Sequence, residues 1–194
     1  MGTAVLTFVL VLGLLLVLLL VPVLIGIVIY NSLVAMRVET DTAWADIDVQ
    51  LKRRHDLVPN LVETVKGYTS HERETLESVT AARSAAVDVR GGSPEQRAGA
   101  ENMLTAAIGR LFALAEAYPQ LRAAEPFQEL QRSLSEIEGD LQQSRRYYNA
   151  TVRELNTRVR QFPSNIVANA ARIREREFFE VESPEEREAP RVEF

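Results

Sequence analysis

The 194-residue chain contains no cysteine, which excludes disulfides, thiol catalysis and thiolate metal sites. Histidine is almost as scarce, since only His55 and His71 occur, too far apart in sequence to share one helix face around a metal ion. No phosphate-binding loop, nucleophile elbow or di-iron Glu-x-x-His pair is present. We therefore expect no metal, no cofactor, no catalytic residue and no enzymatic activity, with both histidines exposed or half-buried on helices.

Lysine is also scarce, and almost all of the 22 basic residues are arginine. Lys52 and Lys66 are the only lysines, the formal net charge is −5, and acidic and basic residues alternate along the chain. A nucleic-acid-binding domain needs a concentrated basic surface. We therefore expect no nucleic-acid partner.

Charged side chains are missing altogether before Arg37. Residues 4–30 are nearly all apolar, and as a helix they span roughly 40 Å, more than the ~30 Å hydrocarbon core of a bilayer. A cleaved signal peptide would begin with basic residues and end at a small-residue cleavage site, and neither feature is present. We expect residues 1–36 to be a single-pass membrane anchor, with its span at about 4–30 and Tyr30 and Arg37 at the membrane interface.

The orientation of this anchor depends on few residues. Arg37 follows the span, and no basic side chain precedes it. Because basic residues favour the cytoplasmic side of a span, the sequence predicts a cytoplasmic C-terminal domain. An extracytoplasmic domain is the alternative.

Beyond Arg37, apolar residues recur at steps of three and four, which is typical of amphipathic helices packed in a bundle. The first stripe keeps its phase across Pro59, so we expect one long helix, kinked at Pro59, that runs to about Val89. It contains Trp44, Ile47, Leu51, Val58, Leu61, Val65 and Tyr68.

The next two helices have clear beginnings. Gly91 and Gly92 end the first helix, and Ser93, Pro94 and Gln96 form a capping sequence that begins the second. The third begins near Glu125 and ends before Pro163, a length of about 36 residues. Apolar residues fall at strict seven-residue intervals in it: Phe127, Leu134, Leu141, Tyr148, Leu155 and Phe162. The predicted fold is all-α, an N-terminal transmembrane helix followed by an antiparallel bundle of three to four long helices over residues 37–168.

Residues 169–194 form an acidic C-terminal tail with few apolar residues. We expect either a partly disordered tail or a strap that docks on the bundle through Phe178, Phe179, Val192 and Phe194.

Several polar and aromatic residues are candidates for interaction or structural roles. Arg54 and Glu72 occupy positions of the seam, which is the stripe of a helix that faces the other helices of a bundle. There they either pair with charges on another helix or lie at the bundle edge. Arg145, Arg146, Tyr148 and Asn149 mix cations with aromatic rings, as contact surfaces do. Trp44 and Pro59 complete the set.

These residues belong to a longer pattern that resembles the bacterial LemA family across residues 30–194. The resemblance is carried by Tyr30-Asn31-Ser32-Leu33-Val34, Trp44, Ile47-Asp48-Val49-Gln50-Leu51-Lys52-Arg53-Arg54-His55-Asp56-Leu57-Val58-Pro59-Asn60-Leu61-Val62, Arg145-Arg146-Tyr147-Tyr148-Asn149, Phe162-Pro163-Ser164-Asn165 and Pro190-Arg191-Val192-Glu193-Phe194. At Ala170-Ala171 the chain departs from the family, which usually has a glycine-containing turn there.

The resemblance implies a LemA-like helical bundle anchored in the bacterial inner membrane, without an assigned enzymatic activity. Family genes often lie near membrane proteases and phosphatase-like modules. We therefore expect a scaffold or adaptor that self-associates into a homo-oligomer and acts in envelope stress or membrane quality control. Its expected partners are the lipid bilayer and a membrane protease or signalling protein. The alternative is a sensory helical bundle coupled to the membrane helix.

Overall fold

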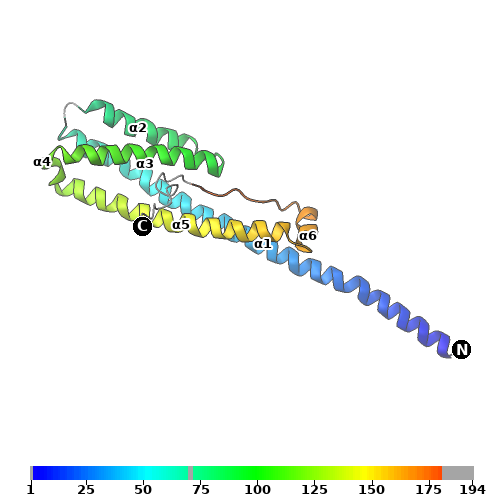
Figure 1. The fold of residues 1–194 in the computed structure, drawn as a ribbon. Helices are drawn as coiled ribbons and strands as arrows, with labels where there is room; N and C mark the ends of the chain where they lie inside the picture. The colour runs from blue at the N-terminus through cyan, green and yellow to red at the C-terminus, as the bar shows by residue number, and fades with distance from the viewer. Residues whose placement is uncertain (1, 70–71, 181–194) are drawn as a thin grey trace, which may run out of the picture. The chain divides into compact units, whose positions relative to one another are not determined.

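The computed structural model describes residues 2–69 and 72–180, and within them the chain is helical with no strand (Figure 1). This confirms the predicted all-α class. The helices are α1 (Gly2–Lys66), α2 (Arg73–Asp88), α3 (Pro94–Glu116), α4 (Pro119–Arg122), α5 (Glu125–Arg160) and α6 (Ser164–Ala170).

The chain divides into two compact units. The span unit comprises Met1–Thr42 and Ala150–Arg176, and the bundle unit comprises Ala43–Asn149 and Glu177–Phe194. Helices α1 and α5 contribute residues to both units. The sequence-based boundaries at residues 36 and 168 stay a prediction.

Helix α1 contains the apolar N-terminal segment. By length and composition, it is the one helix among the described residues that could cross a membrane, and its large apolar side chains from Phe8 to Val28 are exposed. The helix continues without a break through Pro22 and Pro59 to Lys66. A membrane accommodates such a surface because its core is as apolar as the side chains themselves.

The prediction of one helix running to Val89 is wrong. Helix α1 ends at Lys66, directly before Gly67, and α2 begins at Arg73. Glycine has a low helix propensity because it loses the most backbone entropy on folding. The apolar pattern continues after Gly67 because α2 packs its own stripe, Leu76 and Val79, into the same core as Val65. A seam shared by two consecutive helices looks like one helix in sequence.

The predicted beginnings of α3 and α5 are confirmed. Ser93 Oγ accepts a hydrogen bond from Gln96 N at 3.3 Å, and Gln96 Oε1 accepts one from Ser93 N at 3.0 Å. Helix α5 has the expected 36 residues. One seam residue differs from the prediction: Phe162 is 74% exposed, because α5 ends at Arg160 and the seven-residue repeat no longer applies.

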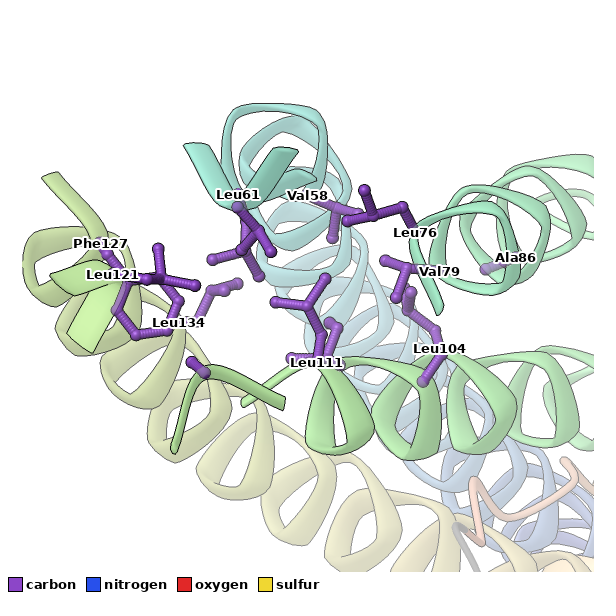
Figure 2. Packing of buried hydrophobic residues seen from close by; sticks show 14 of the residues in the cluster. Val58, Leu61, Leu76, Val79, Ala86, Leu104, Leu111, Leu121, Phe127 and Leu134 are labelled. Atoms are coloured by element: carbon purple, nitrogen blue, oxygen red, sulfur yellow. The ribbon is translucent and has the colours of Figure 1, made fainter. Parts of the chain in front are cut away.

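The core of the bundle unit is made of apolar side chains, most of them aliphatic, from α1 to α5 (Figure 2). Burying each of these large side chains contributes about 1.5–3 kcal/mol. Those at the centre are Val58, Leu61, Leu76, Val79, Leu104, Leu111, Leu121, Phe127 and Leu134.

The span unit has a smaller core of its own. Leu33 of α1 packs in one cluster with Leu155 of α5, Ala168 of α6 and Ile173. Ile29, which belongs to the apolar segment of α1, is packed against this cluster.

After α6 the chain is extended over residues 173–180, here called the strap. Of its two phenylalanines only Phe179 is buried, at 1% exposure against 36% for Phe178. The structure therefore agrees with a docked strap as far as Glu180. The other expected anchors, Val192 and Phe194, lie outside the described residues.

Candidate functional site

A buried polar cluster lies inside the bundle unit, centred on Glu101 of α3. Glu101 Oε1 accepts a hydrogen bond from His55 Nε2 at 2.7 Å, and Glu101 Oε2 lies 3.5 Å from Arg54 Nη1. His55 is 3% exposed, so the expectation of an exposed or half-buried histidine is wrong. The reason is its partner: a carboxylate 46 residues away pairs with Nε2 of the imidazole and offsets part of the cost of burial, while the buried Nδ1 has no hydrogen-bond partner among the described residues.

Arg54 has further partners. Its Nη2 donates to Thr105 Oγ1 at 2.8 Å and lies 3.3 Å from Glu138 Oε2 on α5. Arg145 Nη2 approaches the other oxygen of Glu138 at 3.4 Å. Of the two alternatives for Arg54, the structure therefore places it in pairing with other helices and away from the bundle edge.

Such a cluster contributes more to register than to net stability. Desolvating buried charges costs several kcal/mol per ion, which pairing only offsets, but removing one partner costs about 3–5 kcal/mol. Because Arg54, Glu101 and Glu138 come from α1, α3 and α5, a shift of any one helix would leave a buried charge unpaired. The cluster thus fixes how the three helices align.

Pro59 acts on the same cluster through the backbone. Proline has no N–H, so the carbonyl four residues earlier, that of His55, loses its helical partner. Arg83 Nε of α2 donates to this carbonyl at 2.7 Å. The proline therefore creates an acceptor on α1 that a side chain of α2 fills, and this ties the two helices together.

Replacing Arg83 by methionine is expected to cost about 1–3 kcal/mol, because the half-buried His55 carbonyl loses its donor while the aliphatic stem is kept. In a Pro59→Ala background the residue 59 N–H can donate to the same carbonyl, so the cost should fall below half. Denaturant unfolding of the full-length protein in detergent, followed by Trp44 fluorescence, measures both values. Equal costs in the two backgrounds would contradict this role of Pro59.

Trp44 lies at the centre of an aromatic group in the bundle unit. Its ring centroid is 5.0 Å from that of Tyr148 and 5.5 Å from that of Phe179. The Arg97 guanidinium lies 4.6 Å from the Trp44 ring and pairs with Asp48. Ring pairs and a cation over the indole face each add to the energy of simple burial.

Two asparagines of α5 hold the strap by its backbone. Asn149 Oδ1 accepts from Phe179 N at 2.9 Å, and its Nδ2 donates to Phe179 O at 3.2 Å. Asn156 makes the same pair of bonds with Arg176, at 2.8 and 2.9 Å. Each side-chain amide thus supplies the donor and the acceptor that a neighbouring β-strand would otherwise supply to an extended backbone.

The spacing of the two asparagines matches the strap. Seven residues of α-helix rise about 10.5 Å, and three residues of extended chain rise about 10 Å. Asn149 and Asn156 are therefore in register with Phe179 and Arg176. Tyr148 Oη adds a fifth bond to the strap backbone, donating to Glu177 O at 2.9 Å.

Glu72 has a different environment from Arg54. It immediately precedes α2 and accepts a hydrogen bond from Tyr118 Oη at 3.1 Å. This bond, with a smaller contribution from desolvation, raises the pKa of Tyr118 above its ordinary value. The structure therefore gives Glu72 a hydroxyl partner at a helix end.

The other candidate residues have simpler placements. Tyr30 and Arg146 are exposed, and Arg37 lies 3.9 Å from Asp41 one turn further along α1. His71 lies outside the described residues. Within residues 2–69 and 72–180, no three side chains capable of binding a metal come together.

Several important residues were missed in the sequence. Glu101 follows the buried Ala100 of α3, and Arg54 in the seam of α1 was the available signal for a buried acid opposite it. Arg83 could have been found from Pro59, because every helical proline leaves a carbonyl to be satisfied. For Asn156, the only signal in the sequence was its seven-residue spacing from Asn149.

Comparison with known proteins gives relatives over most of the chain. Magnetosome protein MamQ 2 of Paramagnetospirillum magneticum is 24% identical over 175 residues, which cover 78% of this chain and 64% of the relative. MamQ of Magnetospirillum gryphiswaldense is 22% identical, covering 77% and 64%. Protein LemA of Metamycoplasma hominis is 27% identical over 140 residues, covering 71% and 63%. The chain thus spans a little under two thirds of the length of these relatives.

The LemA family model matches residues 43–194, which is well over half of the chain and includes the buried cluster, the aromatic group and the strap. On this evidence the protein belongs to the LemA family.

Proposed function

We propose that this protein is a membrane-anchored, non-enzymatic scaffold whose helical bundle self-associates. The observation that carries the proposal is α1, because one uninterrupted helix contains both the apolar segment and the core residues Val58, Leu61 and Val65. An anchor that continues into the core of a bundle holds that bundle at the membrane surface.

The proposed location is the bacterial inner membrane, crossed once by α1. Tyr30 would lie at the interface, as tyrosines commonly do, and Arg37 would lie on the cytoplasmic side with the bundle. The extracytoplasmic orientation is the alternative that a labelling experiment distinguishes.

The surface proposed for self-association is a groove of about 670 Å³ between the end of α1 and α2. Val62 and Leu76 contribute apolar atoms to it, and Ala81 is exposed on its wall. Apolar floors with polar rims are typical of protein interfaces.

A second copy of the same chain is the occupant that the rim charges favour. The rim carries Glu63 and Lys66 on α1, and Arg73 and Glu77 on α2. Each helix therefore presents one acid and one base, which pair with each other within the helix at 3.6 Å on α1 and 2.6 Å on α2. A twofold interface places the same patch of two copies face to face. Because each helix of the patch carries both a positive and a negative side chain, the charges of one copy can pair with those of the other.

The full-length protein in detergent is expected to be a dimer by light scattering and sedimentation. Ala81→Glu adds an unpaired charge to the groove without touching the core, so this variant should be monomeric. Ala106→Glu, on an exposed position of α3 outside the groove, is the matched control and should remain dimeric. A monomeric wild-type protein would contradict self-association, and a dimeric Ala81→Glu variant would exclude this groove.

As a cellular role we propose envelope stress or membrane quality control, with a membrane protease or signalling protein as the partner. Membership of the LemA family supports this role. The scaffold would bring that partner to the membrane.

A further inference from the structure

Charge is distributed unevenly between the two units, although it alternates along the sequence. The span unit carries seven arginines and four carboxylates, a formal net charge of +3, in a chain whose net charge is −5. The remaining residues therefore carry −8. The unit that contains the candidate membrane span is thus the basic one.

Part of this positive charge has no carboxylate partner among residues 2–69 and 72–180. Arg160 pairs with Glu175, and Arg176 with Asp41 at 2.6 Å. Arg172 and Arg174 are exposed, and neither forms an ion pair with a carboxylate of the described residues. With Arg37 they line a small pocket of about 200 Å³.

The backbone at this point is held in an unusual conformation. Arg172 has φ 56°, in the left-handed region that costs a residue with a Cβ about 1 kcal/mol or more. Glycine is the usual residue after a helix in this conformation. At position 172 the chain therefore has an arginine where a glycine would be more stable. Arg174 is a second arginine two residues further on.

The pocket belongs to the part of the span unit nearest the membrane. Ile173, between the two arginines, is packed in the cluster that also contacts Ile29 of the apolar segment. Arg37 follows Tyr30 by seven residues, about 10 Å of helix. Headgroups occupy a layer of about 5–8 Å on each side of the hydrocarbon core, and arginine side chains extend towards such charges.

Exposed apolar side chains lie in the same unit. Val159 is packed against the cluster that contacts Ile29, and three residues further on Phe162 is almost fully exposed. Ile166 of α6 is also exposed. Phenylalanine and isoleucine beside basic residues are the composition of segments that lie in a membrane interface.

We propose that the span unit binds the phosphate of anionic lipid headgroups through Arg172 and Arg174, with Arg37 completing the pocket. The planar guanidinium can form paired hydrogen bonds with phosphate oxygens, which a neutral side chain cannot. Phe162 and Ile166, which are exposed in the same unit, also enter the membrane interface. The inference rests on the proposed membrane anchoring and makes the protein selective for the lipids around its anchor.

The test uses full-length protein in nanodiscs of phosphatidylcholine and phosphatidylglycerol, with the lipids retained on the protein counted by native mass spectrometry. Wild-type protein should retain phosphatidylglycerol in excess of its share of the bilayer. One arginine near an anionic surface changes the binding constant about five-fold, so Arg174→Gln should reduce the enrichment about five-fold and Arg172→Gln/Arg174→Gln more. Arg122→Gln/Arg132→Gln, exposed arginines of the bundle unit, should leave it unchanged.

Two outcomes would overturn the proposal. One is equal enrichment in wild type and in the folded Arg172→Gln/Arg174→Gln variant. The other is loss of the enrichment when inorganic phosphate matches the lipid phosphate in concentration, which would show a small-anion pocket. Extraction of the native membrane with alkaline carbonate tests the membrane anchoring separately from the lipid preference. A wild-type protein that leaves the membrane there refutes the anchoring, whatever the lipid preference.

Discussion

Replacing Glu101 by alanine is expected to destabilise the full-length protein by about 3–5 kcal/mol, the largest effect of any single polar substitution we propose. The variant leaves the buried Arg54 guanidinium with one carboxylate in place of two, and His55 with no partner at Nε2. The thermal midpoint should fall by on the order of 10 °C. Trp44 fluorescence reports the transition, because Trp44 is the chain's only tryptophan and lies in the bundle unit.

Two controls separate the lost charge pairing from the general effect of removing an acid. Glu136→Ala, on an exposed position of α5, should change stability by no more than about 0.5 kcal/mol. Arg54→Met/Glu101→Leu replaces both charges by apolar groups and should cost less than the two single changes together. Exact additivity of the single changes would show that the two residues do not stabilise each other.

Phe179→Ala should release the strap, with amide hydrogen exchange across residues 177–180 at least about 100-fold faster. Removing a buried phenylalanine costs about 3–5 kcal/mol, and each 1.4 kcal/mol is tenfold in the opening equilibrium. Phe179 is the buried side chain of this segment and contacts Trp44, so its loss removes the main apolar contribution to docking.

Phe178→Ala is a matched control, because it makes the same change one residue earlier on a side chain that is 36% exposed, against 1% for Phe179. It should leave the exchange rate within a few-fold of wild type. If the two variants behave alike, the backbone bonds to Asn149 and Tyr148 hold the strap without the ring, and the docking energy assigned to Phe179 is wrong.

The features that could be predicted from the sequence are the local ones. The capping bonds of Ser93 and Gln96 lie within one helical turn, and the length of α5 follows from a repeat that needs no knowledge of its partners. The membrane-interface positions of Tyr30 and Arg37 rest on the boundary between apolar and charged sequence and stay a prediction. In each case the determining residues are neighbours along the chain.

The features that could not be predicted depend on distant partners. His55 and Glu101 are 46 residues apart, and nothing local to either one indicates the other. The break after Gly67 was hidden because α1 and α2 share one core and so continue one apolar pattern. The strap has no periodicity, and its docking depends on two asparagine amides whose ordinary place is a helix end or the surface.

The most direct test of the account is cysteine labelling in intact cells, for which the cysteine-free chain is already suited. Gly13 and Gly139 have open space where a Cβ would be added, so cysteine fits at either position. With a membrane-impermeant maleimide, Gly13→Cys should stay unlabelled before and after the membrane is opened. Gly139→Cys should become labelled only after opening, which places the bundle in the cytoplasm. Ready labelling of Gly13→Cys would contradict the membrane span, and labelling of Gly139→Cys in intact cells would reverse its orientation.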